Sequence, residues 1–192
     1  MNYLAHAYLS FERPGILVGN MISDFIKGRA KFDYPEAIQE GINLHRAIDD
    51  FTDFHPVTRE AKVFFRPQYR LYSGAFVDIV YDHFLANDKL QFDSEKDLFD
   101  FSFRTYTMLR KYQQHFPYPF SRMFPFMESQ NWLYHYREPE GISRSFEGMT
   151  RRAKYLDESK IAFGIFLENY AALKDCYERF FPELKRFVQS VS

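Results

Sequence analysis

Large apolar residues recur every three or four positions along most of the chain, which is the spacing of one face of an α-helix. The C-terminal example carries Ile161, Ile165, Leu167, Tyr170, Leu173, Tyr177 and Phe180. No segment alternates apolar and polar residues as a strand does, and no repeat or interdomain linker divides the 192 residues. The sequence therefore predicts an all-α fold, a single compact bundle of roughly seven or eight helices over residues 1–192.

Turn residues suggest where these helices begin and end. Gly28 is a plausible stop for a helix that begins at Pro14, and Asp33 with Pro35 can begin a helix that ends near His55–Pro56. Pro67 should interrupt the following helix. Further along the chain we expect an N-cap at Ser94 for a helix that continues through 98–112, and a break over 115–120. We then expect a helix whose end carries Arg151 and Arg152. The last helix should run from about Asp157 to Phe181, with a kink or restart at Pro182.

The composition limits the class of protein. The chain is 46% hydrophobic and 20% aromatic, so it can bury a core and is not globally disordered. A net charge of −1 offers no broad basic surface for nucleic acid. The single cysteine, Cys176, excludes an intrachain disulfide and fits a packing residue in a reducing compartment. No apolar run is long enough to insert into a membrane, so we expect a soluble, cytoplasmic protein whose oligomeric state the sequence leaves open.

Histidine and aspartate are concentrated on two otherwise apolar helices between His45 and His83. His45, Asp49 and Asp53 are spaced i, i+4, i+8, so they share one face of the first helix. Asp78 and Asp82 have the same spacing on the second, with His83 adjacent. A carboxylate among apolar residues is costly unless it is paired or bound to metal. Imidazole and carboxylate together suit manganese, iron, zinc or magnesium, so this set predicts a metal site.

The candidate ligands differ in strength. Asp24 joins the set because it falls near the apolar face of its helix, between Met21 and Phe25. The leading candidates are Asp24, His45, Asp82 and His83, and the weaker ones are His6, Asp49 and Asp78. Each of these side chains could instead be solvated or paired with an arginine, and a lone histidine such as His6 is more often a core residue.

Basic residues near this set could serve a phosphate ester. Arg46 follows His45, and Lys27 comes shortly after Asp24, so either could neutralise charge during metal-assisted hydrolysis or could be a structural ion-pair partner. A basic strip, formed by Arg59, Lys62, Arg66 and Arg70, has helical spacing. It is either a solvated face or a docking strip for an acidic partner. The chain has no glycine-rich phosphate loop, nucleophile elbow or CxxC motif.

Several short motifs, taken in order, resemble one known family. They are Met1–His6; Gly19-Asn20 with Asp24-Phe25 and Lys27-Gly28; His45–Asp49 with Thr52-Asp53; Asp78 with Asp82–Leu85; Trp132-Leu133 with Tyr136-Arg137; and Gly148-Met149 with Arg151-Arg152. This pattern is similar to that of the acyl carrier protein phosphodiesterase family and covers most of the chain.

The resemblance implies an all-helical fold distantly related to the HD-type metal phosphohydrolases. It also implies hydrolysis of the phosphodiester between 4′-phosphopantetheine and a serine of holo acyl carrier protein, with a divalent cation, typically manganese, or else magnesium or iron. On this basis we expect the catalytic residues to be Asp24, His45, Arg46, Asp82 and His83, with Lys27 and the basic strip docking the acidic carrier protein. One departure is that Asp82-His83 reverses the adjacent His-Asp pair of the HD group.

Two other classes of function fit the same residues. A metal-dependent phosphohydrolase of a small nucleotide or phosphate ester would use the metal site but not the basic strip. A noncatalytic helical module that binds acyl carrier protein would use the strip and would need no metal. The sequence does not decide the identity or the number of the metal ions.

Overall fold

Helices account for nearly all of the computed structural model, which describes residues 1–152 and 159–191. No strand occurs among these residues, so the predicted all-α class is confirmed. The described α-helices are α1 (Tyr3–Tyr8), α2 (Pro14–Ile22), α3 (Glu36–Phe54), α4 (Pro56–Tyr69), α5 (Ser73–Ala86), α6 (Glu95–Arg110), α7 (Tyr118–Ser129), α8 (Trp132–His135), α9 (Pro139–Arg152), α10 (Ser159–Glu168) and α11 (Tyr170–Val191). Short 3-10 helices are η1 (Ser23–Phe25), η2 (Gly28–Asp33), η3 (Arg70–Tyr72) and η4 (Gln113–His115). None of the described helices is both long and apolar enough to cross a membrane.

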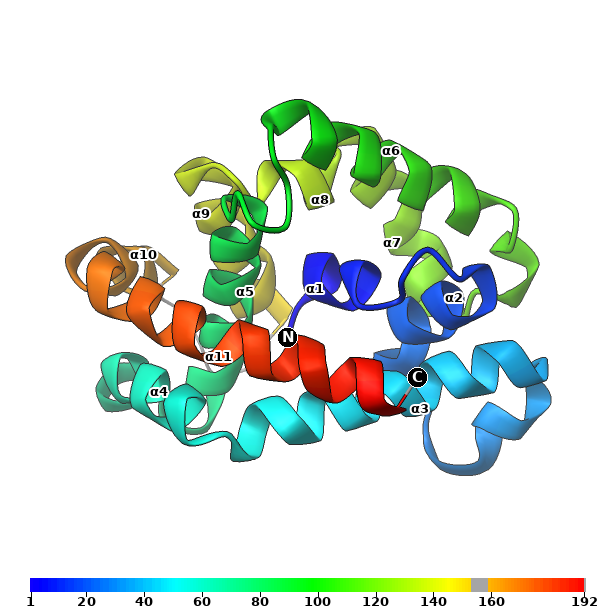
Figure 1. The fold of residues 1–192 in the computed structure, drawn as a ribbon, viewed down its shortest axis with the longest axis horizontal. Helices are drawn as coiled ribbons and strands as arrows, with labels where there is room; N and C mark the ends of the chain where they lie inside the picture. The colour runs from blue at the N-terminus through cyan, green and yellow to red at the C-terminus, as the bar shows by residue number, and fades with distance from the viewer. Residues whose placement is uncertain (153–158, 192) are drawn as a thin grey trace.

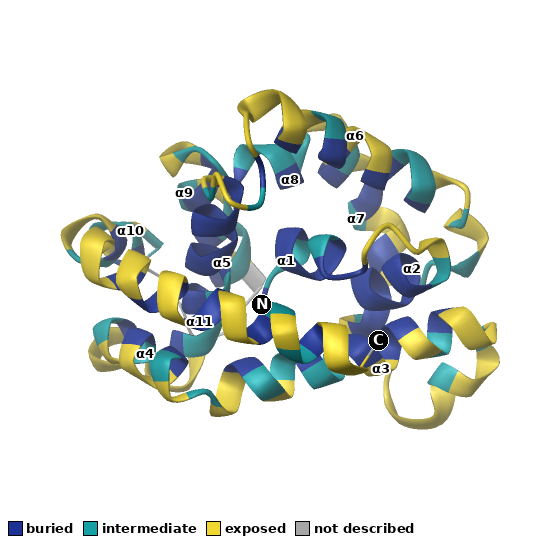
Figure 2. Cartoon of the chain, in the orientation of Figure 1, coloured by how far each residue is buried: buried dark blue, intermediate teal, exposed yellow. Residues whose placement is uncertain are grey.

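The helices are arranged around α1 and α5. Helix α11 crosses one face of the molecule and packs on α3, α4 and α5, while α6, α7 and α8 lie on the other side of α1 (Figure 1). Most outer helices have one buried and one exposed side, whereas α5 is buried on almost every side (Figure 2). Asp82 and His83 of α5 therefore face protein rather than solvent and need partners there, whereas Asp78 is partly exposed.

Two glycines allow α2 and α3 to meet backbone to backbone. A Cβ at Gly19 would lie 2.0 Å from the carbonyl oxygen of Ile38, and a Cβ at Gly41 would lie 2.2 Å from that of Ile16. Only glycine fits such close approach at both positions. The contact places the end of α2, which carries Asn20, directly beside the middle of α3.

Several predicted boundaries are confirmed. Helix α3 ends at Phe54, before Pro56. Ser94 is the N-cap of α6, where its Oγ accepts a hydrogen bond from the Asp97 amide at 3.2 Å. The chain also breaks between η4 and α7, as expected, and the described part of α9 includes Arg151 and Arg152.

Other predicted boundaries are wrong. Helix α2 ends at Ile22, and Gly28, with φ of 55°, begins η2 instead of ending α2. Pro67 lies inside α4, which continues to Tyr69, because a proline so near the helix end removes only one late hydrogen bond.

The predicted last helix is two helices. Helix α10 ends at Glu168 and α11 begins at Tyr170, while the expected start at Asp157 lies outside the described residues. Helix α11 continues past Pro182 to Val191, with Phe180, Phe181 and Leu184 buried around the proline. Burial of these side chains stabilises the helix by more than the proline costs.

Candidate metal site

His6, His45 and Asp49 come together from two helices that are far apart in sequence. His6 lies on α1, and the other two lie one turn apart on α3. The carboxylate of Asp49 lies 3.2 Å from Nε2 of His6 and 3.0 Å from Nε2 of His45. One ligand atom from each residue lies within 4.8 Å of the others, so the three can surround one ion.

Asp24 adds a second carboxylate at the solvent side of this group. It belongs to η1, and its Oδ1 lies 3.1 Å from Nε2 of His45. Both histidines are almost fully buried, but the side chain of Asp24 is 62% exposed. The group therefore has a closed inner side and an edge that solvent, and a substrate, can reach.

Asn20 fixes the orientation of both imidazoles. Nδ1 of His6 donates to Oδ1 of Asn20 at 2.7 Å, and Nδ1 of His45 donates to the backbone oxygen of Asn20 at 2.7 Å. The amide nitrogen of Asn20 donates to the His6 carbonyl and to Oγ of Ser10, which identifies Oδ1 as the acceptor. Each histidine thus presents the unprotonated Nε2 of its neutral form to the carboxylates, an arrangement typical of metal-binding histidines.

The protonation of the two histidines differs. Burial, together with the charge of His45, lowers the pKa of His6 to about 4. Burial also acts to lower the pKa of His45, but hydrogen bonds with Asp24 and Asp49 outweigh it and raise that pKa to about 9. Burial would raise the pKa of Asp49, yet its hydrogen bonds to His45 and His6 hold it far below the usual range. Without metal, the carboxylates of Asp24 and Asp49 therefore share one proton, which His45 carries.

This donor set fits a divalent transition metal. Two imidazole nitrogens and two carboxylates converge, and both are ligand types that such ions prefer. Behind them, the Met1 ammonium lies 3.4 Å from Asp49 and 3.1 Å from Asp78. Burial dominates at Asp78 and raises the pKa of its carboxyl group despite that ammonium. Asp78 therefore borders the group through Met1 and makes no direct contact with either histidine among the described interactions.

Asp82 lies at the start of α1 and not in this group. It is fully buried, and its two oxygens accept from the amides of Leu4 at 2.7 Å, Ala5 at 3.2 Å and Asn2 at 3.4 Å. These are the amides that the first turn of a helix leaves without partners. Burial raises the pKa of Asp82 to about 7, although these amides favour the ionised form. Asp82 thus acts as a cap for α1, the helix that carries His6.

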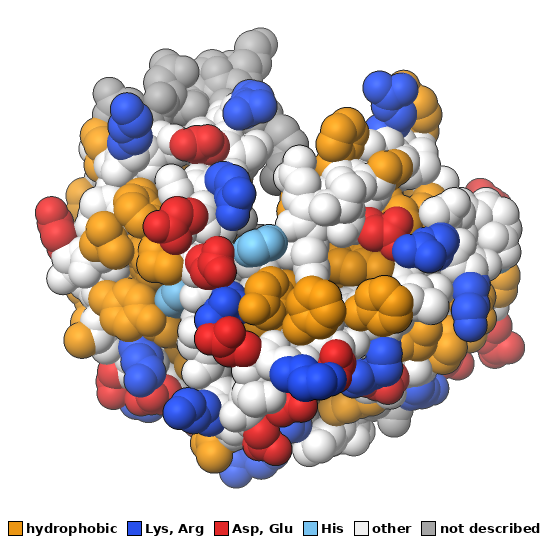
Figure 3. Space-filling model, turned by 90° about the horizontal axis from the view of Figure 1, so that it is seen from above, with side chains coloured by type: hydrophobic (Ala, Val, Ile, Leu, Met, Phe, Trp, Pro, Cys, Tyr) orange, Lys and Arg blue, Asp and Glu red, His pale blue; other side chains and the backbone are white. Residues whose placement is uncertain are grey.

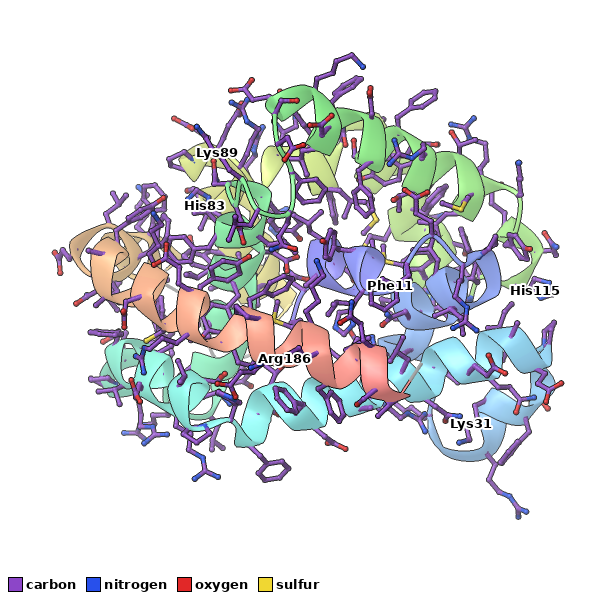
Figure 4. The ribbon with its side chains drawn as sticks, in the orientation of Figure 1. Phe11, Lys31, His83, Lys89, His115 and Arg186 are labelled. Carbon is purple, nitrogen blue, oxygen red and sulfur yellow. The ribbon has the colours of Figure 1, made fainter. Side chains whose placement is uncertain are left out.

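His83 is also apart from the group. Its Nδ1 donates to the carbonyl of Tyr136 at 2.8 Å, and its Nε2 accepts from the hydroxyl of Tyr170 at 3.0 Å. Burial lowers its pKa. Figure 4 shows His83 toward the C-terminal end of α5, after which the chain continues to Lys89, and well away from α3. Both ring nitrogens are therefore engaged where α5, α11 and the end of α8 meet.

The two cations expected near the phosphate, Arg46 and Lys27, both belong to or contact the segment that follows Asp24. Arg46 is half-buried, and its guanidinium donates to the carbonyl of Ile26 at 3.1 Å, which ties α3 to the segment after η1. Lys27 is exposed on that same segment. Lys27 is thus close to Asp24 in sequence, and Arg46 contacts Ile26, the residue before Lys27.

Three members of the basic strip line one groove. Lys62, Arg66 and Arg70 border a groove of about 730 Å³, hereafter the basic groove, together with Asp53 and Asp78. Lys62 pairs with Asp53 at 2.7 Å, whereas Arg66 and Arg70 have no acidic partner within the described part of the chain. Arg59 is exposed outside the groove lining.

Sequence reasoning did not identify Asn20 or Met1 as parts of the site. The available signal for Asn20 was its place after Gly19, a glycine that permits the close contact of α2 with α3. For Met1 no local pattern exists, because its contacts with Asp49 and Asp78 depend on the packing of three helices.

Comparison with known proteins gives a consistent result. The family model described as acyl carrier protein phosphodiesterase matches residues 1–184. Proteins named acyl carrier protein phosphodiesterase are similar to this chain over almost its whole length. The one from Yersinia pestis is 32% identical, and the match covers 98% of each chain. The one from Enterobacter sp. (strain 638) is also 32% identical, and the match covers 96% of this chain and 95% of that protein. One from Klebsiella pneumoniae (strain 342) is 31% identical over 99% of this chain and 98% of its own. No solved structure matches significantly.

Proposed function

The chain belongs to the acyl carrier protein phosphodiesterase family, and we propose that it hydrolyses the phosphodiester between 4′-phosphopantetheine and a serine of holo acyl carrier protein. The products are the apo carrier protein and free 4′-phosphopantetheine. The observation that supports this most is the convergence of two imidazole Nε2 atoms and two carboxylates at an edge open to solvent.

In this proposal His6, His45, Asp49 and Asp24 hold a divalent cation, which we take to be manganese. A bound metal ion polarises a phosphoryl oxygen and lowers the pKa of a bound water. Asn20 holds the two imidazoles in the required tautomer. In this proposal Asp24, the most exposed of the four ligands, also accepts a proton from the attacking water, and Arg46 with Lys27 offers positive charge to the phosphodiester.

The basic groove gives an acidic carrier protein a place to dock. Its unpaired cations, Arg66 and Arg70, lie on the same groove as Asp78, which contacts Met1, which in turn contacts Asp49. Asp78 and Met1 thus link the lining of the groove to the metal ligand Asp49. By contrast, basic and acidic side chains are interspersed on the face seen from above (Figure 3). Local concentration of positive charge favours encounter with an acidic partner.

Mass spectrometry of holo acyl carrier protein, incubated with the protein and manganese, tests the function directly. We expect loss of the phosphopantetheine mass, prevented by a chelator and by His45→Ala. The matched control is Asp50→Asn, on an exposed neighbour of Asp49 that has no described contact with the group, and it should retain activity.

Each other outcome identifies an alternative. An unchanged carrier mass with stoichiometric bound metal would contradict the substrate assignment and favour a small phosphate ester. An unchanged carrier mass, no bound metal and intact carrier binding would favour a noncatalytic module.

A further inference from the structure

A second hollow also borders α5, where it is lined by Ile79, the residue after Asp78 of the basic groove. It has a volume of about 150 Å³ and is lined by residues from the start of the chain, from α5, from α8 and from α9. Its aromatic wall comprises Tyr3, Trp132 and Tyr136. We refer to it as the aromatic pocket. Its volume suits part of a small molecule, because pockets for whole drug-sized ligands are larger.

The lining combines apolar surface with amide and hydroxyl groups. Asn2, Gln130 and Ser145 line the pocket beside the aromatic wall. The indole Nε1 of Trp132 donates to Oε1 of Gln130 at 2.9 Å, and the Asn2 amide donates to the hydroxyl of Tyr136 at 3.0 Å. Amide and hydroxyl groups that already form such hydrogen bonds can also pair with the amides of a ligand. The lining is therefore suited to a flexible chain that carries both methyl or methylene groups and amides.

The pocket carries one cation. Arg144 of α9 lines it, is exposed, and has no acidic partner within the described part of the chain. An unpaired arginine is a good partner for a phosphate oxygen. The pocket thus offers charge for an anion next to a wall for an apolar and amide chain.

Neighbouring residues connect the pocket to the metal site. Asn2 lines the pocket, and the preceding residue, Met1, contacts Asp49. Ile79 also lines the pocket, whereas the preceding residue, Asp78, lines the basic groove. Successive residues of a helix point about 100° apart, so α5 presents one to each hollow. The Met1 ammonium, which contacts Asp49 and Asp78, therefore links the metal ligand Asp49 to a residue of the basic groove, and the peptide bond to Asn2 links it to the aromatic pocket.

We propose that the aromatic pocket binds the pantetheine arm of the substrate while the carrier protein docks along the basic groove. This inference rests on the proposed function. A phosphodiester has two substituents, and the metal site has two adjacent hollows of different chemistry. The arm, with its geminal methyl groups, hydroxyl and two amides, matches the aromatic pocket. The acidic protein matches the basic groove.

The only tryptophan in the chain, Trp132, reports on this pocket, so binding can be measured without turnover. The full-length protein is titrated with pantetheine, which lacks the phosphate, and with 4′-phosphopantetheine, while the emission of Trp132 is recorded. The blocking variant is Gly148→Leu, because Gly148 lines the pocket and a Cβ there meets no atom within 4 Å. Gly164→Leu is the matched control, since a Cβ at Gly164 in α10 is equally unobstructed and lies outside the pocket.

We expect a saturable change in emission with both ligands in the wild type and in Gly164→Leu. Gly148→Leu should weaken binding by about tenfold or more and raise the KM for holo carrier protein by a similar factor. Arg144→Gln should weaken binding of 4′-phosphopantetheine more than that of pantetheine. The inference is overturned if neither ligand changes the emission, or if Gly148→Leu binds and turns over substrate like the control.

Failure of the inference can be told apart from failure of the proposed function. If the wild type removes the arm from the carrier protein but Gly148→Leu does so equally well, the pocket assignment is wrong and the function stands. If pantetheine binds beside Trp132 and the carrier mass never changes, the pocket is a pantetheine site and the hydrolysis is wrong.

Discussion

The imidazole rings of His6 and His45 are stacked, with centroids 3.9 Å apart and planes 13° apart. Burial, and then the charge of the neighbouring His45, lower the pKa of His6 to about 4, whereas at His45 the hydrogen bonds with Asp24 and Asp49 outweigh burial and raise the pKa to about 9. Over the range between these values the metal-free pair holds a single proton. Metal binding must displace this proton from His45.

Replacement of the shared carboxylate should remove the metal. Asp49→Asn leaves His6 and His45 without the carboxylate that faces both Nε2 atoms. We expect loss of bound manganese, measured by elemental analysis, and a decrease in carrier hydrolysis of about a hundredfold or more. Asp50→Asn should retain both. Full metal content in Asp49→Asn would show that other residues hold the ion.

The metal-free protein should become less stable as the pH rises from 6.5 to 9. His45 has a folded pKa of about 9 against an ordinary value of 6.5, so its stabilising contribution is complete below 6.5 and is lost as the pH rises through 9. The loss should be on the order of 2–3 kcal/mol. Denaturant unfolding after chelator treatment measures it. His45→Gln should flatten this part of the profile, and an equal slope in that variant would contradict the assignment.

Asp82→Asn should reduce stability without removing the metal ligands. An asparagine has one acceptor oxygen in place of the two that receive the Leu4 and Ala5 amides, so one buried amide loses its partner. We expect a loss of about 1–3 kcal/mol in the free energy of unfolding. At saturating manganese the metal stoichiometry should be unchanged. Asp93→Asn, at an exposed position, is the control. Loss of metal with unchanged stability would instead identify Asp82 as a ligand.

Charge reversal in the basic groove should weaken docking of the carrier protein. Arg66→Glu with Arg70→Glu replaces two unpaired cations of the groove, and we expect the KM to rise by about tenfold at low salt. About 0.5 M salt should raise the wild-type KM and reduce the difference, because exposed charges are screened. Arg122→Glu on α7 is the control, an equally exposed arginine outside the groove. A salt-independent KM would rule out electrostatic docking.

Gly41→Ala should force α2 and α3 apart. The new Cβ would lie 2.2 Å from a backbone oxygen of α2, which cannot move aside as a side chain could. We expect a loss of about 1–3 kcal/mol in the free energy of unfolding. Gly164→Ala, whose Cβ meets no neighbour, should be neutral or slightly stabilising. If both variants unfold at the same denaturant concentration, the close contact is not required.

The fold class could be predicted because helical periodicity is local information. The common helix face of His45 and Asp49 could be predicted for the same reason, since their i, i+4 spacing fixes it. The approach of His6 and Asp24 to these two residues depends on tertiary packing, which spacing along the sequence does not encode. The close contact at Gly19 and Gly41 carries Asn20 to both histidines, and nothing in the sequence indicates that these two glycines meet.

Buried carboxylates show the limit of sequence reasoning most clearly. Asp49 and Asp82 have the same signal, an aspartate among apolar residues on a helix. In the structure, Asp49 faces two imidazoles, whereas Asp82 accepts from backbone amides of α1. Backbone amides belong to every residue except proline, so the sequence cannot indicate which carboxylate they will satisfy.

The glycine contact between α2 and α3 also bears on which ions the site can accept. Because the two helices touch through backbone atoms, no side chain lies between them that could change rotamer and let the helices move closer. The separation of Asn20 from His45 is therefore set by atomic radii and resists contraction around a small cation. For the metal site proposed above, ionic size, and not only ligand type, should therefore govern the order of metal preference.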